Sequence, residues 1–244
     1  MMDTVRGTIR RRILVNFRVD PNVAQRRLPH GFVPKLSAGY AVAGVCLIRL
    51  ENERPSRVPA WLGLSSENAA HRFGAYRIDG DLREDCVYIA RRHSGSLANL
   101  ALGGRIFPGE HHAARFAVRD ETGCIDLTMA APDGYAVKVR ARRASAMPTG
   151  SVFASVADAS RYFRGGSIGY SETRSGTSLD GLELGATRWE IAPLDVGFVR
   201  SSYFDDRERF PRGTIEFDSA LLMTDIDHEW RRAKSIRHAT RICA

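Results

Sequence analysis

The sequence feature that most constrains the fold is an alternation of apolar and polar residues, seen first between Thr8 and Val19. In that segment most apolar residues occupy odd positions and most polar residues even ones, with only Arg11 and Leu14 out of step. Successive side chains of a strand point to opposite faces, so the alternation predicts a strand with one face on a core. The segment 39–48 is apolar at both parities and predicts a fully buried strand.

Further strand patterns outnumber the helical ones. Strands are expected at 86–92, 112–118, 124–130, 135–142, 189–191, 196–203 and 214–221. Helical signals are limited to 20–28, 96–102 and 155–163, and Asp20 and Ser155 are typical N-cap residues. Because the βαβ rhythm of a parallel sheet is absent, we predict a mainly β (α+β) fold: an antiparallel, barrel-like domain with a few short helices.

We expect residues 1–244 to form a single domain. All-β barrels of this length often form one domain, although a prior of roughly 150 residues per domain also allows two. Residues 165–185 contain six glycines together with many serines and threonines. This composition predicts a long flexible loop, serving either as an active-site cover or only as an exposed hairpin. A basic tail is expected from about Trp230.

The formal net charge of +8 raises the question of nucleic-acid binding. Of the basic residues, 33 are arginine and 3 are lysine, and they are spread over the whole chain. A nucleic-acid footprint would instead cluster basic and aromatic residues on one element. We therefore expect no nucleic-acid partner.

Nothing in the sequence indicates a membrane protein. The longest uninterrupted apolar run, 40–48, has nine residues, whereas a membrane-spanning helix needs about 20. The first six residues include no apolar stretch of the kind that forms the core of a signal peptide. We therefore expect a cytoplasmic protein without a membrane partner.

Side chains that commonly hold metals or cofactors are not arranged for that role. Cys46, Cys86, Cys124 and Cys243 form no CxxC pair, which argues against a zinc site and against a disulfide scaffold. Acidic residues and a histidine occur within 225–229, but no third ligand region is evident, so a solvated acidic turn is favoured. Dinucleotide, phosphate-loop and hydrolase-nucleophile motifs are absent. We expect no metal and no cofactor.

Two adjacent histidines form the most chemically suggestive cluster. On a strand, His111 and His112 would point to opposite faces and would not chelate one ion. His112 shares its parity with Ala114 and Phe116, which predicts an inward orientation, whereas His111 would face outward with Arg115. An inward histidine is either a general base or a hydrogen-bonded core residue. His112 is therefore a candidate catalytic residue.

Several motifs in the first 130 residues occur together in a known superfamily. The segments concerned are 13–20, 28–29, 86–90, 97–108 and 112–116. Together they resemble the acetoacetate decarboxylase-like proteins, and the later ones resemble a large bacterial branch of that superfamily. The resemblance implies a cone-shaped antiparallel β-barrel with a small-molecule pocket in its interior.

The resemblance also identifies a catalytic group that this chain lacks. In acetoacetate decarboxylase a lysine forms a Schiff base with a β-keto acid, and a neighbouring cation activates it. The matching segment here, 105–112, contains no lysine. The lysines of the chain lie elsewhere, in a turn (Lys35), on a strand face expected to meet solvent (Lys138) and in the basic tail (Lys234). We therefore expect no Schiff-base chemistry.

Site residues follow from the same resemblance. With Asp20 as anchor, a family arginine that grips the substrate carboxylate falls on Arg10, and a guanidinium matches a carboxylate with two hydrogen bonds. The alternative is that Arg10 faces solvent. A family active-site glutamate falls on Glu67, whereas 42–47 contains no acidic partner for it. Arg105 is a second candidate for binding an anionic group.

Two functions are compatible with these features. The first is an enzyme acting on a small carboxylate or carbonyl compound, with Glu67 or His112 moving protons and Arg10 or Arg105 binding the anion. The alternative is a non-catalytic small-ligand-binding or sensing barrel, because one fold hosts many functions. In both the partner is a small molecule, and a homo-oligomer is left open. We expect Glu67 and His112 to line one interior cavity, with Arg10 or Arg105 at its wall.

Overall fold

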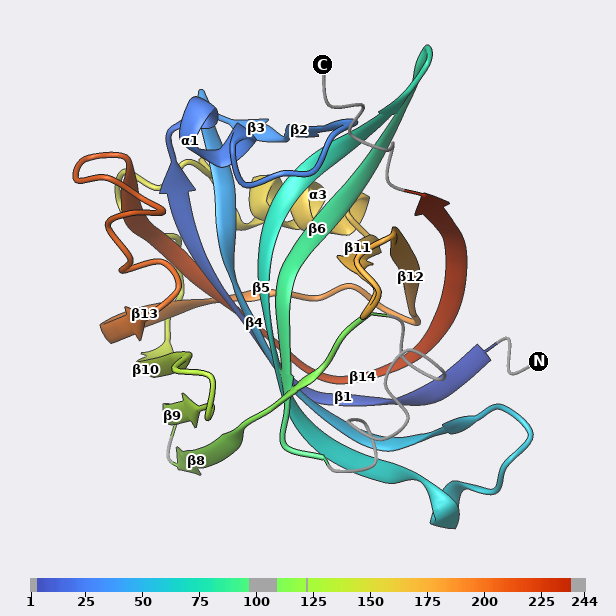
Figure 1. Ribbon diagram of the computed structural model, residues 1–244. Helices are drawn as coiled ribbons and strands as arrows, with labels where there is room; N and C mark the ends of the chain where they lie inside the picture. The colour runs from blue at the N-terminus through green and yellow to red at the C-terminus, as the bar shows by residue number, and fades with distance from the viewer. Residues whose placement is uncertain (1–3, 97–108, 122, 238–244) are drawn as a thin grey trace.

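The computed structural model describes residues 4–96, 109–121 and 123–237. Strands dominate, and they form one 14-stranded sheet that curls round on itself (Figure 1). The strands up to the middle of the chain are β1 (Thr4–Val19), β2 (Phe32–Pro34), β3 (Leu36–Ser37), β4 (Tyr40–Pro55), β5 (Leu64–Asp79), β6 (Leu82–Ser94), β7 (His112–Ala113) and β8 (Arg115–Glu121). Those that follow are β9 (Cys124–Ala130), β10 (Ala136–Arg143), β11 (Ile168–Glu172), β12 (Ser178–Ala186), β13 (Ala192–Ser201) and β14 (Ile215–Arg237).

The curled sheet closes through a pairing between the first and last strands. β1 pairs with β4 on one side and with β14 on the other, antiparallel in both cases. The order β1-β4-β5-β6-β11-β12-β14 is therefore a closed circuit of paired strands. The strands β13, β10, β9 and β8 continue from β14 on the other side of the molecule (Figure 1). The predicted mainly β fold is confirmed, although β6 pairs in parallel with β11 and with β7.

The central strands are buried on both faces. On one face, Ile13 of β1 and Leu47 of β4 belong to a core that extends to β9 and β10. On the other face, Leu14 and Cys46 belong to a second core that includes Phe163 of helix α3 (Val156–Gly165). The strand expected at 8–19 is confirmed. Its second face is also buried, because the helix side of the molecule covers it.

The α-helices of the described residues begin where their N-cap residues predict. Asp20 accepts two backbone hydrogen bonds, of 2.8 and 3.1 Å, at the first turn of α1 (Pro21–Gln25). Ser155 accepts one of 3.1 Å at the first turn of α3 (Val156–Gly165). Beyond its first residue, the helix expected at 96–102 lies outside the described residues. No helix in the described part of the chain is both long enough and apolar enough to span a membrane.

The glycine-rich segment 165–185 forms a hairpin and not a flexible loop. Its strands β11 and β12 pair with each other and also with β6 and β14. Close packing favours glycine there: a Cβ on Gly181 would lie 2.8 Å from a β14 side chain, and one on Gly169 would lie 2.9 Å from Ile89 Cδ1, which would have to shift. The expected basic tail is likewise part of the sheet, because β14 continues to Arg237.

Two β-bulges decide which side chains face the helix side of the sheet. Between Ile9 and Arg11, β1 has one residue more than its partner β4. Between Ile89 and Arg91, β6 has one residue more than its partner β5. An extra residue reverses the facing of every position beyond it. For this reason Ile9 and Leu14 differ in parity and yet belong to the same core.

Candidate active site

A cavity of about 120 Å³ lies inside the closed circuit of strands. Every strand of the circuit contributes lining residues, and Phe163 of α3 adds an apolar wall. Some of the lining side chains carry a nitrogen or a hydroxyl group: Arg12, Asn68, Arg72, Arg92, His93, His111, Ser167, Trp189 and Trp230. We call this site the arginine cavity, after Arg12, Arg72 and Arg92.

Three strands supply one arginine each to the cavity. Arg12 follows the bulge in β1, and Arg92 follows the bulge in β6. Arg92 pairs with Ala70 of β5, which is two residues from Arg72, so the side chains of both arginines point to the same face. The bulges thus place these arginines on one face of the sheet, which a regular alternation of side chains along β1 and β6 would not predict.

The cavity carries positive charge without a balancing carboxylate. Burial lowers the pKa of Arg72 and that of Arg92 to about 10, so both remain cations at neutral pH. None of the lining residues, which all lie in the described part of the chain, is aspartate or glutamate. A buried cation without a counter-ion is costly. The arrangement therefore favours an anionic ligand.

Several buried hydrogen-bond donors at the cavity have no acceptor in the described structure. Arg72 is 3% exposed; its Nη2 donates to Asn16 Oδ1 at 2.7 Å, but its Nε and Nη1 have no partner. The indole Nε1 of Trp189 and that of Trp230 are also buried without a partner. Each such group costs about 1–3 kcal/mol. The cavity is therefore suited to a molecule that is rich in acceptor atoms.

His111 contributes a neutral imidazole to the same cavity. Its Nδ1 lies 3.1 Å from the carbonyl oxygen of Gly109. A carbonyl only accepts hydrogen bonds, so Nδ1 carries the proton and Nε2 keeps a lone pair. Burial, followed by the nearby charge of Arg92, lowers the pKa of His111 to about 3. The imidazole is therefore unprotonated at neutral pH.

Glu67 and Arg10 do not line this cavity. Glu67 points away from it and accepts a hydrogen bond from Arg11 at 2.8 Å, whereas its neighbour Asn68 lines the cavity. Arg10 is the bulged residue of β1; 60% of its side chain is exposed, and it forms an ion pair with Asp225. The structure therefore does not place Glu67 or Arg10 at this cavity, because alternation and the bulge turn their side chains elsewhere.

Of the two adjacent histidines, His111 and not His112 lines the cavity. His112 is half-buried, as are other residues of its parity, but it lies 5.9 Å from the ring of His93 and 3.6 Å from Glu110. The outward orientation expected for His111 is wrong, because β7 begins at His112 and strand alternation does not extend to His111. Arg105, the second expected anion-binding residue, lies outside the described residues.

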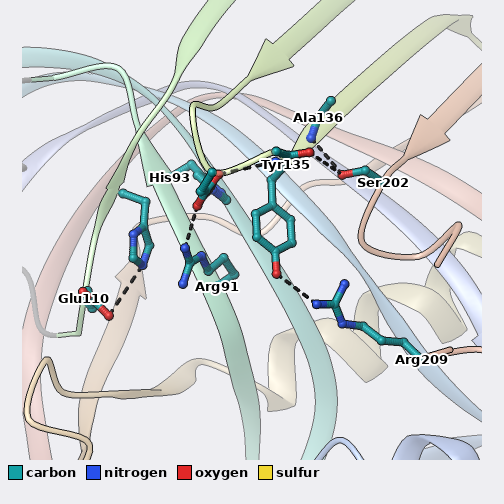
Figure 2. A network of polar contacts seen from close by, with 10 residues as sticks. Arg91, His93, Glu110, Tyr135, Ala136, Ser202 and Arg209 are labelled. Carbon is teal, nitrogen blue, oxygen red and sulfur yellow. Dashed lines mark hydrogen bonds and ion pairs between the residues drawn. The ribbon is translucent and has the colours of Figure 1, made fainter.

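A second polar cluster joins β6 to the turn between β9 and β10 (Figure 2). Asp133 in that turn accepts a hydrogen bond from Arg91 Nη2 at 2.6 Å and lies 3.2 Å from His93 Nε2. Burial opposes ionisation of Asp133, but the hydrogen bonds from Arg91 and His93 outweigh it and lower its pKa to about 2. Arg209 donates to the Tyr135 hydroxyl at 3.3 Å. The cluster anchors β6 next to the arginine cavity.

Asp133→Asn is expected to lower the free energy of unfolding at neutral pH by about 1 kcal/mol, because the carboxylate loses its contacts with Arg91 and His93 at a site where solvent screens part of the attraction. The folded-state pKa lies below the unfolded value. The stabilisation that the Asp133 carboxylate gives the wild type is therefore present above about pH 4 and is lost as the pH falls towards about 2. Urea unfolding of both proteins should show the difference shrinking with acidification. Asp126→Asn, which breaks an exposed ion pair with Arg140, is the control and should change little.

His71 predicts a second acid-dependent effect. It is fully buried, neither ring nitrogen has a partner, and burial followed by the charge of His93 lowers its pKa to about 3. Between about pH 6.5 and 3 the unfolded state binds a proton that the folded state does not. Each unit by which the pH is lowered in this range therefore reduces the free energy of unfolding by up to about 1.4 kcal/mol. His71→Phe, which keeps a ring beside Tyr203, should reduce this slope in thermal unfolding between pH 7 and 5. An unchanged slope would contradict the assignment.

The lysines of the chain lie away from the arginine cavity, and the described residues form no cluster of metal ligands. No lysine lines the cavity: Lys35 donates to the Tyr162 carbonyl at 2.7 Å and pairs with Asp85, while Lys138 and Lys234 are exposed. Within the described ranges, no group of three or more His, Cys, Asp or Glu side chains is arranged to hold a metal ion.

Comparisons with known sequences identify no relative. No protein-family model matches the sequence, and no curated protein is similar enough in sequence to count as a match.

Solved structures do share the fold. An acetoacetate decarboxylase-like enzyme from Sphingomonas wittichii RW1 has a TM-score of 0.60 at 14% identity, covering 96% of this chain and 91% of its own. Acetoacetate decarboxylase from Legionella pneumophila has a TM-score of 0.58 at 11% identity, covering 95% and 87%. The enduracididine biosynthesis enzyme MppR, complexed with pyruvate, has a TM-score of 0.55 at 11% identity, covering 97% and 90%. The fold that the resemblance implied is confirmed.

Proposed function

From the fold that this chain shares with acetoacetate decarboxylase-like enzymes, we propose that it acts on a small carboxylate or carbonyl compound without Schiff-base chemistry. The substrate binds in the arginine cavity, where Arg72 and Arg92 hold its carboxylate. His111, in place of Glu67 or His112, moves the proton. The protein works in the cytoplasm with this small molecule as its partner, and whether it forms a homo-oligomer is a separate question.

The observation that carries the proposal is the set of unpartnered donors beside uncompensated cations. A carboxylate supplies both the negative charge and the acceptor oxygens that Arg72, Trp189 and Trp230 lack. The cavity volume of about 120 Å³ approaches that of an engineered cavity of roughly 150 Å³ that binds benzene. The ligand is therefore an oxo or hydroxy acid of a few carbons. MppR, which has the same fold, was solved with such an acid, pyruvate.

The chemistry follows from which groups surround the bound acid. A carboxylate beside Arg92 offsets the positive charge that helps to lower the pKa of His111, so binding makes Nε2 a stronger base. The base then removes a proton from the carbon next to the carbonyl group. The guanidinium groups stabilise the negative charge that develops on the carbonyl oxygen.

The absence of a lysine from the cavity leads to a direct prediction. Incubation with acetoacetate and borohydride should leave the mass of the protein unchanged, because no amine is placed to form a reducible imine. Intact-mass spectrometry is the measurement, with an authentic acetoacetate decarboxylase as the positive control. A stable adduct on Lys35, Lys138 or Lys234 would overturn this part of the proposal.

One observation favours a second candidate, a non-catalytic binding barrel. A base whose pKa is about 3 in the unliganded protein removes protons poorly at neutral pH. The deciding experiment screens small oxo and hydroxy acids by thermal shift and then follows each hit by NMR for chemical change. Conversion of a hit supports the enzyme. Binding without conversion of any hit supports the barrel, and no hit at all refutes both.

A further inference from the structure

The cavity contains a nucleophile to which the proposed function gives no role. Cys46 of β4 is buried and lines the arginine cavity. The Nε of Arg12 donates a hydrogen bond to its Sγ at 3.3 Å. A guanidinium in this place stabilises the negative charge that develops on the sulfur when it attacks an electrophile.

The other two arginines of the cavity lie on the same face of the sheet as this sulfur. Cys46 of β4 pairs in register with Ala70 of β5, which pairs with Arg92 of β6, and Arg72 lies two residues from Ala70 on β5. Arg12, Arg72 and Arg92 thus line the same cavity as the sulfur. Such electropositive surroundings are typical of reactive cysteines and not of structural ones.

The remaining described cysteines lack these surroundings. Cys86 lies in the other core, where burial, reinforced by the charge of Glu84, raises its pKa to about 12. Cys124 lies at the start of β9 and is partly exposed. Neither lines the arginine cavity. Both therefore serve as internal controls for the reactivity of Cys46.

An independent feature indicates what would meet the thiol. Arg72 is 3% exposed, lines the same cavity and has two guanidinium nitrogens without a partner. A carboxylate that satisfies these nitrogens lies near Cys46, because both residues line the cavity and Cys46 pairs in register with Ala70, two residues from Arg72. In a 2-oxo acid, such as pyruvate or glyoxylate, the carbonyl carbon is bonded directly to the carboxylate. Binding of the acid therefore brings an electrophilic carbon to the thiol.

We propose that Cys46 adds reversibly to the carbonyl carbon of an oxo acid held in the arginine cavity. A bond forms between Sγ and the carbonyl carbon while the carbonyl π bond breaks. The thiol proton ends on the former carbonyl oxygen, giving a thiohemiacetal or thiohemiketal. No oxidant, reductant or second reactant is consumed. The inference rests on the proposed function only in that both need the acid to bind here.

Binding and bond formation are measured separately with glyoxylate labelled with ¹³C at its aldehyde carbon. Calorimetry reports binding, and NMR reports a protein-bound tetrahedral carbon distinct from that of free glyoxylate hydrate. We expect the wild type and Cys86→Ser to show both signals. Cys46→Ser should still bind but lose the tetrahedral-carbon signal. Binding by the wild type without that signal would overturn the inference and leave the proposed function standing, whereas absence of binding would refute both.

A second readout uses the wild type alone and so does not depend on folding of a variant. Iodoacetate carries a carboxylate and iodoacetamide does not, while both alkylate thiols at the same carbon. Peptide mapping should show that iodoacetate modifies Cys46 about tenfold faster than iodoacetamide does, since the arginines recruit the anion. Cys124 should show no such preference for the anion. A Cys46 that is unreactive, or that prefers the neutral reagent, would contradict the inference.

Discussion

Arg72→Met is expected to weaken binding of the best acid from the screen by about a hundredfold or more. Truncating one member of a buried charge pair in a complex costs roughly 2–5 kcal/mol, and Arg72 offers two otherwise unpartnered nitrogens to the ligand. The unliganded variant should unfold with a free energy close to that of the wild type. Removal of a desolvated cation offsets the loss of the hydrogen bond to Asn16.

The matched control is Arg10→Met. Arg10 is exposed and bonded to Asp225, so this change removes a cation from β1 without touching the cavity. Calorimetric titration should give wild-type affinity for Arg10→Met and strongly reduced affinity for Arg72→Met, with urea unfolding confirming that both fold. Equal affinities for Arg72→Met and the wild type would refute the arginine cavity as the binding site.

His111→Gln is expected to slow turnover by about 10²–10⁴-fold, the usual contribution of general acid–base catalysis. Glutamine can keep the hydrogen bond to the Gly109 carbonyl oxygen but has no basic nitrogen to remove a proton. The affinity for the acid should stay within a few-fold of wild type, because the arginines are unchanged. Steady-state kinetics on a hit that the wild type converts, together with calorimetry, separate the two effects.

The same histidine predicts the acid side of the pH profile. The pKa of His111 in the unliganded protein is about 3, so the base remains unprotonated well below neutral pH. kcat/KM should therefore stay level down to about pH 5 and fall only where the base begins to gain a proton. His112→Gln, which alters the neighbour outside the cavity, should keep most of the activity. Loss of turnover in His112→Gln but not in His111→Gln would reverse the assignment.

The sequence was sufficient to predict the strands whose pattern is local. The alternation along 8–19 and the segment 124–130, which coincides with β9, predict strands because side-chain facing in a strand has a period of two. Asp20 and Ser155 mark helix starts because an N-cap side chain bonds to the turn beside it. For 165–185 the flexible loop was wrong and the hairpin alternative was right, but its paired strands were not predicted. Gly169 and Gly181 pack closely against β6 and β14, whereas Gly176 has the positive φ of the turn.

The candidate site was predicted only in part. The resemblance implied an interior pocket and an arginine on the first strand, but the arginine that lines the pocket is Arg12 and not Arg10. A bulge depends on how many residues the partner strand supplies, which no local pattern in β1 reveals. One signal was available for Arg72: it lies between His71 and Phe73 in a segment otherwise composed of small and apolar residues. An arginine in such a segment is rarely buried without a partner to bind.

The most direct test is a crystal structure with the tightest-binding acid from the screen. The account predicts one acid molecule inside the closed circuit of strands, its carboxylate within hydrogen-bond distance of Arg72 and Arg92 and its carbonyl carbon beside Cys46 and His111. An acid bound instead among exposed arginines such as Arg10, or beside Asp133 and His112 with the arginine cavity unchanged, would contradict it.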